Sequence, residues 1–366
     1  CYQVDETQGD IYLVSKWDRS KVIGRPNVYL AIDTASGLIA GLYVGLDAGE
    51  TAMMACIANA AMDKTAYCAA YGIDLSPADW PSRGLPSEII SDRGGEFVGD
   101  RINELCICYG IDRQALPPFR AEEKPLVERA MDLIQESYKS MLRGRGVIGD
   151  DVGERWATDY RKQAILTLDE YTAIVIHTII ALNKGRVLTD IGHLPVDAPN
   201  TPARLWQWLV DQGKTTLLDV DADELYRRAL PRASGKLTRK GILCNGLRYL
   251  PERGAELTIG GKIEYAYDPQ DTSHIYVIAE DKRLIPCALA PSSARYSGYD
   301  MADVAVMRRE ESEREKAARQ MELEARVAMR SEIERIIRQA EEQSTGSVKD
   351  ISDIPQNRTN ERRRLT

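Results

Sequence analysis

The sequence predicts an α/β fold with a mixed β-sheet, followed by a helical segment, a small β-barrel and a long charged helix. Three observations support this prediction. β-rich and helix-forming runs alternate over residues 1–142, short strands separated by Gly, Pro and Asp turns follow position 241, and a charge-dense helical stretch begins near 301. The 366 residues exceed one average domain, and a composition of 43% apolar and 28% charged residues allows a packed core.

The first 149 residues contain three strands and then a helix, a strand, a helix, a strand and a helix. The three opening strands are joined by short connections, which predicts an antiparallel meander. The final helix is amphipathic and has Pro125 in its first turn, where a missing backbone N–H is tolerated. The expected strands are 2–14 (broken at Gln8-Gly9), 27–33, 38–46, 88–91 and 113–116, and the expected helices are 50–71, 99–109 and 124–142.

Changes in composition divide the chain into five expected segments. They are an α/β domain (1–149), a helical linker (150–225), a small β-barrel (226–298), a charged helix (299–343) and a flexible polar tail (344–366). The apolar positions of the charged helix are too sparse to sustain a heptad, which argues against a coiled coil.

Several classes of protein are disfavoured by composition. A run of about 18 apolar residues is absent, which excludes a membrane span, and the N-terminus carries no secretory signal. The seven Cys are scattered without a CxxC pair and only three His are present, so we expect reduced thiols rather than disulfides or structural zinc. Because the chain opens on Cys1 and not Met, we expect it to be the interior of a longer protein.

Charge is segregated along the chain. The net charge of −8 and the pI near 5.2 argue mildly against a nucleic-acid partner. Residues 226–241, however, contain six cations and no acid, which predicts contact with a DNA backbone between the core and the barrel. These cations are Arg227, Arg228, Arg232, Lys236, Arg239 and Lys240.

Three carboxylates occupy the ends of different predicted elements: Asp5, Asp92 and Glu128. If they converge they repel one another unless cations neutralise them, and hard oxygen ligands favour Mg²⁺ or Mn²⁺. Two such ions about 3.5–4 Å apart suit in-line displacement at phosphorus. The alternative is that Asp at a strand end is only a turn residue, since 56 acids make many triples possible.

Four stretches in this order resemble the catalytic core of the retroviral-integrase superfamily, and most closely the TnsB-type transposases, relatives of phage Mu transposase. They are residues 2–7 (YQVDET), 29–37 (YLAIDTASG), 91–97 (SDRGGEF) and 124–129 (KPLVER). Supporting residues lie at 21–26, 64–68, 80–81 and 117–120, and residues 241–289 resemble the barrel that follows the core in Mu-type transposases. The resemblance covers about residues 1–290.

The resemblance implies a ribonuclease-H-like core with a mixed five-stranded sheet, in which Asp5, Asp92 and Glu128 are the catalytic residues and metal ligands. It further implies Mg²⁺ as cofactor, with Mn²⁺ able to substitute and two ions per site. Metal-activated water would cleave at a transposon 3′ end, and the freed hydroxyl would attack target DNA. Pro125 departs from the family, which usually has Gly there, so the flexibility of that loop differs.

Other charged residues near the expected site have less specific roles. A further set of basic residues is expected to contact phosphates, although a solvated helix face explains each equally well. These are Arg93, Arg120, Lys124, Arg129, Lys139, Arg143 and Arg145. Asp10 and Glu96 are expected outside the ligand set, and Asp33 is expected to cap a turn.

The resemblance also implies partners: transposon-end and target DNA, further copies of the chain in an oligomer such as a tetramer, and a TnsC-like ATPase bound by the tail. It implies a bacterial, cytoplasmic and nucleoid-associated protein with no membrane contact. Two alternatives stay open. One is a catalytically inactive DNA-bound scaffold that recruits an ATPase, and the other is a ribonuclease-H-like nuclease, for which the barrel and tail have no evident use.

Overall fold

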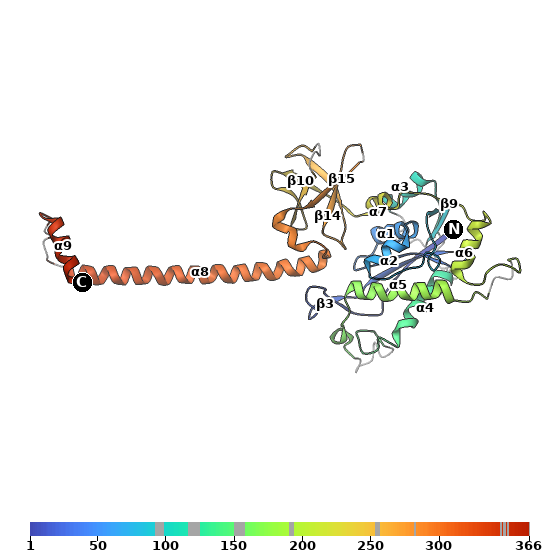
Figure 1. Ribbon diagram of the computed structural model, residues 1–366, viewed down its shortest axis with the longest axis horizontal. Coiled ribbons are helices and arrows are strands. Elements are labelled where there is room, and N and C mark those ends of the chain that lie inside the picture. The colour runs from blue at the N-terminus through green and yellow to red at the C-terminus, as the bar shows by residue number, and fades with distance from the viewer. Residues whose placement is uncertain are drawn as a thin grey trace. The chain divides into compact units, whose positions relative to one another are not determined.

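The computed structural model describes residues 1–91, 99–115, 125–149, 158–189, 194–252, 257–281, 283–344, 346, 349 and 351–365. The chain forms two compact units, residues 1–305 and residues 306–366. The first unit contains a five-stranded sheet and a six-stranded barrel, and Figure 1 labels some of the barrel strands. Among the helices of the described ranges, none has the length and apolar character needed to cross a membrane.

The mixed five-stranded sheet that the sequence predicted is confirmed. Its strands lie in the order β5–β4–β1–β7–β8, with antiparallel pairs β5–β4 and β4–β1 and parallel pairs β1–β7 and β7–β8. The bounds are β1 (Tyr2–Gln8), β4 (Asn27–Asp33), β5 (Ile39–Gly45), β7 (Glu88–Ser91) and β8 (Asp112–Ala115).

The first strand is shorter than predicted. The chain leaves the sheet at Gly9, whose backbone N–H donates to the Pro26 carbonyl at 2.8 Å. β2 (Leu13–Val14) then pairs with β3 (Val22–Gly24) in a separate two-stranded ribbon. The predicted break at Gln8-Gly9 is therefore confirmed, but the two halves of the run 2–14 belong to different sheets, because Gly9 ends the extended run before the apolar residues that follow.

α1 (Glu50–Ala61) covers one face of the sheet, against β4 and β5. At Gly41 a Cβ would lie 2.5 Å from the Cys56 carbonyl oxygen, so only glycine allows this close approach of strand and helix. The single helix predicted over 50–71 is wrong. The chain turns extended at Met62, and Asp63 caps a new helix, α2 (Lys64–Ala70), by accepting from the Thr65 N–H at 2.7 Å.

α4 (Pro125–Lys139) and α5 (Leu168–Gly185) cover the opposite face of the sheet. A capping box between Thr167 and Glu170 starts α5. Near its other end the buried Asn183 amide bonds both the N–H and the carbonyl of Ile39, at 2.9 and 3.0 Å. The segment predicted as a linker thus contributes a helix to the layer on this face of the sheet.

Shorter elements connect these layers. They are β6 (Leu85–Pro86), which pairs with β9 (Leu217–Leu218), together with α3 (Asp100–Tyr109), η3 (Tyr160–Gln163), α6 (Pro202–Asp211) and α7 (Ala222–Ala229). All seven cysteines are free, as the sequence predicted.

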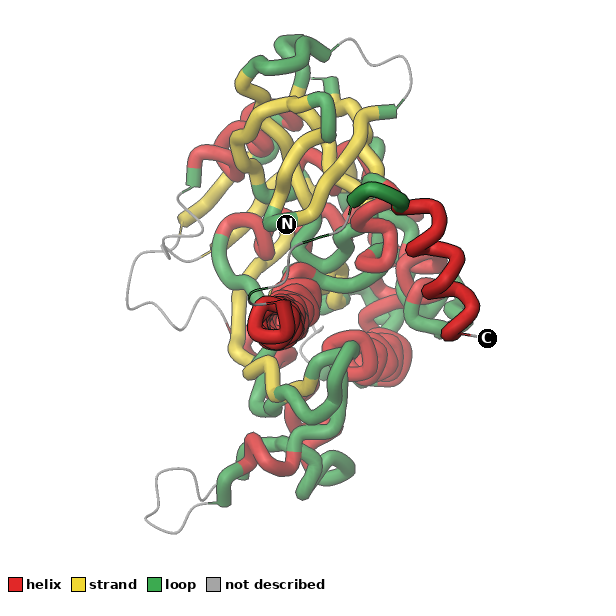
Figure 2. Tube along the Cα trace, turned by 90° about the vertical axis from the view of Figure 1, so that its left-hand side faces the viewer, coloured by secondary structure: helices red, strands yellow, loops and turns green. Residues whose placement is uncertain are grey.

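The predicted small barrel is confirmed as six strands that close in the order β10–β11–β12–β15–β14–β13. Figure 2 colours its strands yellow, as it does those of the sheet. The bounds are β10 (Arg232–Thr238), β11 (Gly241–Cys244), β12 (Leu247–Pro251), β13 (Lys262–Tyr267), β14 (His274–Ile278) and β15 (Leu284–Leu289), and η4 (Pro291–Tyr296) follows. No strand forms at the described residues 257–259, where one was predicted.

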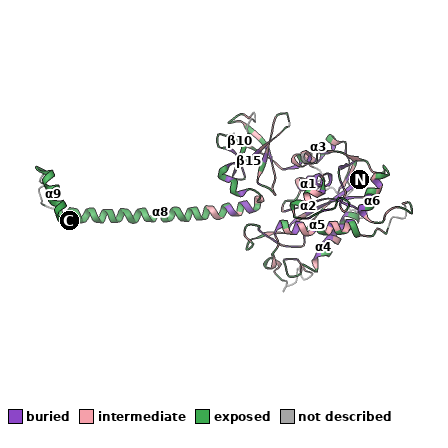
Figure 3. Cartoon of the chain, in the orientation of Figure 1, coloured by how far each residue is buried: buried purple, intermediate pink, exposed green. Residues whose placement is uncertain are grey.

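The second unit consists of residues 306–344 of α8 (Met301–Ser344) and of α9 (Ile354–Leu365). Nearly all of its described side chains are exposed, as Figure 3 shows. Ion pairs between residues three or four positions apart occur along α8, including Arg326–Glu322 at 2.8 Å. Within the predicted tail, residues 354–365 are helical, and Asp353 starts this helix by accepting from the Gln356 N–H at 3.1 Å.

Candidate active site

Asp5 lies on β1 and faces the α4–α5 side of the sheet. Side chains alternate along a strand, and the neighbouring Val4 packs in the buried cluster around α1. The cross-strand partner of Asp5 is Leu30, which packs in the other cluster, together with Val127 of α4. Asp5 is half-buried, so its carboxylate lies at the boundary between this apolar layer and solvent.

Glu128 lies in the first turn of α4, which packs on β1 and β4. The apolar face of this helix is buried through Val127, Ala130 and Ile134, whereas Glu128 is exposed. A carboxylate in the first turn of a helix is stabilised by the helix dipole. Asp5 and Glu128 therefore belong to elements that pack against each other on one side of the sheet.

Asp92, the third predicted ligand, lies outside the described residues, as does Glu96. β7 runs parallel to β1, with Ile90 opposite Gln3, and ends at Ser91, the residue before Asp92. Among the described His, Cys, Asp and Glu side chains, no group of three or more is placed to hold a metal ion.

Asp10 joins the end of β1 to the end of α4. Its carboxylate pairs with Arg25 at 2.9 Å and with Lys139, the last residue of α4, at 3.1 Å. These contacts tie together the two elements that carry Asp5 and Glu128. Lys139, predicted to contact DNA, thus already has a carboxylate partner.

Asp33 caps a turn, as the sequence predicted. Its buried carboxylate accepts from the Ser36 hydroxyl at 2.6 Å and from the Ser36 N–H at 3.0 Å. Burial raises the pKa of Asp33, and the bonds from Ser36 oppose that rise. These two bonds hold the Asp33 carboxylate in the turn, so it is not available as a metal ligand.

Besides Lys139, six residues near α4 were predicted to bind phosphates, and the structure describes three of them. Arg129 and Arg143 are exposed, and Arg145 is exposed while donating to the Met141 carbonyl at 2.7 Å. The remaining three, Arg93, Arg120 and Lys124, lie outside the described residues.

The basic segment 226–241, predicted to contact DNA and assigned to the barrel, spans the end of α7 and the first barrel strand. Arg227 and Arg228 end α7, and Arg228 pairs with Glu224 at 2.6 Å. Arg232 and Lys236 lie in β10, which pairs with β13. The last two, Arg239 and Lys240, are exposed between β10 and β11.

The structural role of Arg101 was not predicted from the sequence. Its Nη2 donates to the carbonyl oxygens of Arg228, Ala229 and Leu230 at 2.9, 2.6 and 2.5 Å, which gives partners to the C-terminal end of α7. Glu50 accepts from the N–H groups of Arg101 and Ile102 at 2.8 and 2.9 Å. Burial lowers the pKa of Arg101, and nearby Arg232 lowers it further. Arg101 thus links α3 to the chain entering the barrel.

Two domain families match the sequence. Residues 3–144 match the family model described as the TnsB C-terminal domain, and residues 229–286 match the one described as Mu transposase, C-terminal.

Two curated relatives extend this similarity. The transposon Tn7 transposition protein TnsB of Escherichia coli is 30% identical over 381 residues, covering 100% of this chain and 54% of that protein. The transposase for transposon Tn552 of Staphylococcus aureus is 23% identical over 305 residues, covering 81% of this chain and 55% of that protein. The chain therefore spans about half the length of these relatives.

Solved structures of integrases are also similar. The catalytic core domain of BIV integrase aligns with a TM-score of 0.30 and 19% identity, over 58% of this chain and 97% of that one. The HTLV-2 integrase catalytic core domain in complex with magnesium (dimeric form) aligns with a TM-score of 0.30 and 15% identity, over 56% and 92% of the two chains.

Proposed function

By its two matched domains this chain belongs to the TnsB-type transposases, and from this membership we propose that it cuts transposon 3′ ends and joins them to target DNA. The resemblance predicted from the sequence motifs is confirmed at the level of the family. The proposed chemistry is hydrolysis of one phosphodiester, followed by attack of the freed 3′-hydroxyl on another.

One observation supports the proposed site above all others. Asp5 on β1 and Glu128 in the first turn of α4 lie on the same side of the sheet, at elements that pack together. β7 is the parallel neighbour of β1, and its last residue immediately precedes Asp92. We therefore propose Asp5, Asp92 and Glu128 as one catalytic group, with the ribonuclease-H-like arrangement that the family implies.

The donor chemistry fits a divalent cation. Asp5 and Glu128 offer hard carboxylate oxygens, and their partly or fully exposed side chains are accessible to a hydrated ion. Mg²⁺, with Mn²⁺ as a substitute and two ions per site, would neutralise charge at the reacting phosphate when bound. Asp5, Asp92 and Glu128 would hold it, while the Asp10 ion pairs keep β1 and α4 in place.

The basic residues supply contacts to the DNA backbone in this proposal. The exposed cation Arg129 follows Glu128 on α4 and the exposed Arg143 lies in the turn after this helix, while Lys236, Arg239 and Lys240 are exposed on the barrel. We further propose that copies of the chain assemble on paired transposon ends, and that the second unit recruits a TnsC-like ATPase.

A strand-transfer assay with pre-cleaved end DNA and Mg²⁺ tests the catalytic proposal, using the longest protein that the gene encodes. We expect Asp92→Asn and Asp5→Asn each to abolish joining while DNA binding is retained. Normal joining by either variant would refute the site. If the unaltered protein binds end DNA and recruits an ATPase without joining, the inactive scaffold replaces this proposal.

A ribonuclease-H-like nuclease would share the same carboxylates. An RNA–DNA hybrid separates the two functions, because the proposed transposase leaves it intact. Rapid cleavage of the hybrid, together with no joining of transposon ends, would favour the nuclease.

A further inference from the structure

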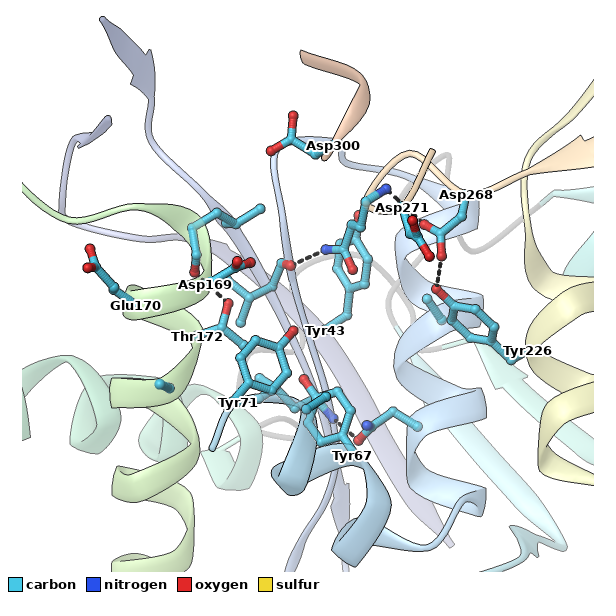
Figure 4. A pocket seen from close by; sticks show the side chains of 18 of the residues that line it. Tyr43, Tyr67, Tyr71, Asp169, Glu170, Thr172, Tyr226, Asp268, Asp271 and Asp300 are labelled. Carbon is cyan, nitrogen blue, oxygen red and sulfur yellow. Dashed lines mark hydrogen bonds between the residues drawn. The ribbon is translucent and has the colours of Figure 1, made fainter. Parts of the chain in front are cut away.

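A cavity of about 570 Å³ lies within the first unit, away from Asp5 and Glu128. Its lining comes from β5, α1, α2, α5 and α7, from the turn after β13 and from the residues before α8. Figure 4 shows side chains of these elements pointing toward the shared space. Core and barrel residues far apart in the sequence therefore meet around one hollow.

Tyrosine rings form much of its wall: Tyr43, Tyr67, Tyr71 and Tyr226. Tyr67 and Tyr71 are in edge contact, with ring centroids 5.4 Å apart. Tyr43 is only 9% exposed, and no hydrogen bond joins its hydroxyl to another described residue. Because Tyr43 lines the cavity, its hydroxyl is available to a group bound there.

Carboxylates surround the tyrosines: Asp169, Glu170, Asp268, Asp271 and Asp300. The single cation among the described lining residues is Lys16, whose Nζ is already bound to Asp169 at 2.7 Å. Asp268 accepts from the Tyr226 hydroxyl at 2.6 Å and from the Gln270 N–H at 2.8 Å. Burial raises the pKa of Asp268, and it raises that of Asp300 to about 6.

The side chains that line the cavity indicate the charge and the chemical class of its ligand. A DNA phosphate would be repelled by the carboxylates. A metal ion is also disfavoured, because in the described part of the chain no three acidic, His or Cys side chains are gathered closely enough to hold one. Aromatic faces together with distributed carboxylates suit an organic cation, whose methylene stem packs on the rings while its charged head meets the acids.

We propose that this cavity binds an aliphatic cation, a protonated amine or guanidinium group carried on a methylene chain. Tyr43, Tyr71 and Tyr226 contact the stem, and Asp268 and Asp300 receive the charged head. Two sources share this chemistry: a free polyamine, and a basic side chain of another polypeptide. The proposal is independent of the catalytic site, since none of these residues belongs to it.

Calorimetric titration of the full chain without DNA tests the proposal, with spermidine and a tri-arginine peptide as separate probes. We expect saturable binding of at least one probe in buffer of fixed ionic strength. Binding of spermidine alone would assign the cavity to a free polyamine, and binding of the peptide alone would assign it to a basic side chain. Failure of both, or equal heats from Mg²⁺ at the same ionic strength, would overturn the proposal.

Two substitutions test whether the cation binds in this cavity. Tyr43→Phe removes only the hydroxyl, and Asp300→Asn removes a charge while keeping the oxygen that accepts from the Asp303 N–H. We expect Asp300→Asn to weaken binding about tenfold, equivalent to about 1.4 kcal/mol, and Tyr43→Phe to weaken it by a smaller factor.

The control is Asp74→Asn, which removes an exposed carboxylate that does not line the cavity. If this variant weakens binding as much as Asp300→Asn, the attraction is only to net charge and the proposal fails. Should Asp300→Asn not fold, Asp271→Asn replaces it, because Asp271 is exposed and also lines the cavity. Unchanged binding by the cavity variants would likewise refute it.

Discussion

Two regions of the first unit use polar residues in opposite ways. Where α1 meets α2, Lys64 is buried and bound to backbone: it donates to the carbonyls of Ala60 and Met62 at 3.2 and 2.9 Å. On the α4 side of the central sheet, Asp5 is half-buried and Glu128 is exposed. Both faces are closed by apolar clusters, so the hydrophobic layer alone does not distinguish them.

This difference separates stability from activity. A buried polar group that satisfies backbone carbonyls contributes to folding, and its removal leaves unpaired groups. An exposed carboxylate contributes little to folding and is available for a ligand. Substitutions around α1 should therefore change the free energy of unfolding, and substitutions of Asp5 or Glu128 should change the chemistry.

Glu128→Gln gives the largest expected effect. We expect strand transfer to fall on the order of 10²–10³-fold or more, because one oxygen ligand loses its charge, while the free energy of unfolding changes by less than about 0.5 kcal/mol. Strand-transfer rates and urea denaturation measure the two quantities. Asp132→Asn, an exposed acid on the same helix, is the control and should keep its activity. A loss of several kcal/mol in stability would contradict the contrast between these two regions.

Gly41→Val tests the packing of α1 on the sheet. A Cβ there would lie 2.5 Å from the Cys56 carbonyl oxygen and 2.8 Å from the Ala60 Cβ, so the helix must move. We expect a loss of about 3 kcal/mol in urea denaturation. Gly185→Ala is the matched control, because nothing lies within 4 Å of its added Cβ. Equal stability of both variants would refute the close approach.

Arg101→Met tests the link from α3 to the chain that enters the barrel. It leaves three carbonyl oxygens at the end of α7 without their shared donor, and we expect a loss of about 2 kcal/mol. Urea denaturation measures the loss, and faster hydrogen exchange in α7 should accompany it. Arg161→Met removes a surface ion pair with Asp159 and should be neutral. An unaltered exchange rate in α7 would contradict this role.

Lys64 predicts a dependence of stability on pH. Burial lowers its pKa in the folded protein to about 7, below the usual value near 10.4 that applies when the chain is unfolded. Between pH 7 and 10 the unfolded state binds more protons, so the free energy of unfolding should rise with pH in this window. Relative to Lys64→Met, we expect a rise of about 1 kcal/mol per pH unit between pH 7 and 9. A flat difference between the two proteins would show that Lys64 keeps its proton when buried.

The smallest effect is expected for the exposed cations of the barrel. If Arg239 and Lys240 contact phosphates, each substitution to Ala should reduce the slope of log affinity against log salt concentration by about 0.9. Fluorescence anisotropy with end DNA at several salt concentrations measures this slope. Lys349→Ala, in the second unit, is the control. An unchanged slope for both barrel variants would remove them from the DNA interface.

The sequence by itself predicted the five strands of the central sheet in their order along the chain, the existence of the barrel and the family. These features depend on periodicity and on motifs such as SDRGG, which are local properties of the chain. It also predicted the turn-capping role of Asp33, because an aspartate and a serine three residues apart form such a turn without help from distant residues.

Only the tertiary structure decided which side chains meet. It assigned Arg232 and Lys236 to a barrel strand, placed Arg101 against the end of α7, and brought Tyr43, Tyr226 and Asp268 around one cavity. Each of these contacts joins residues many positions apart, and so depends on how whole elements pack. Local propensity carries no information about such partners, because the free energy of packing arises only when distant surfaces are brought together.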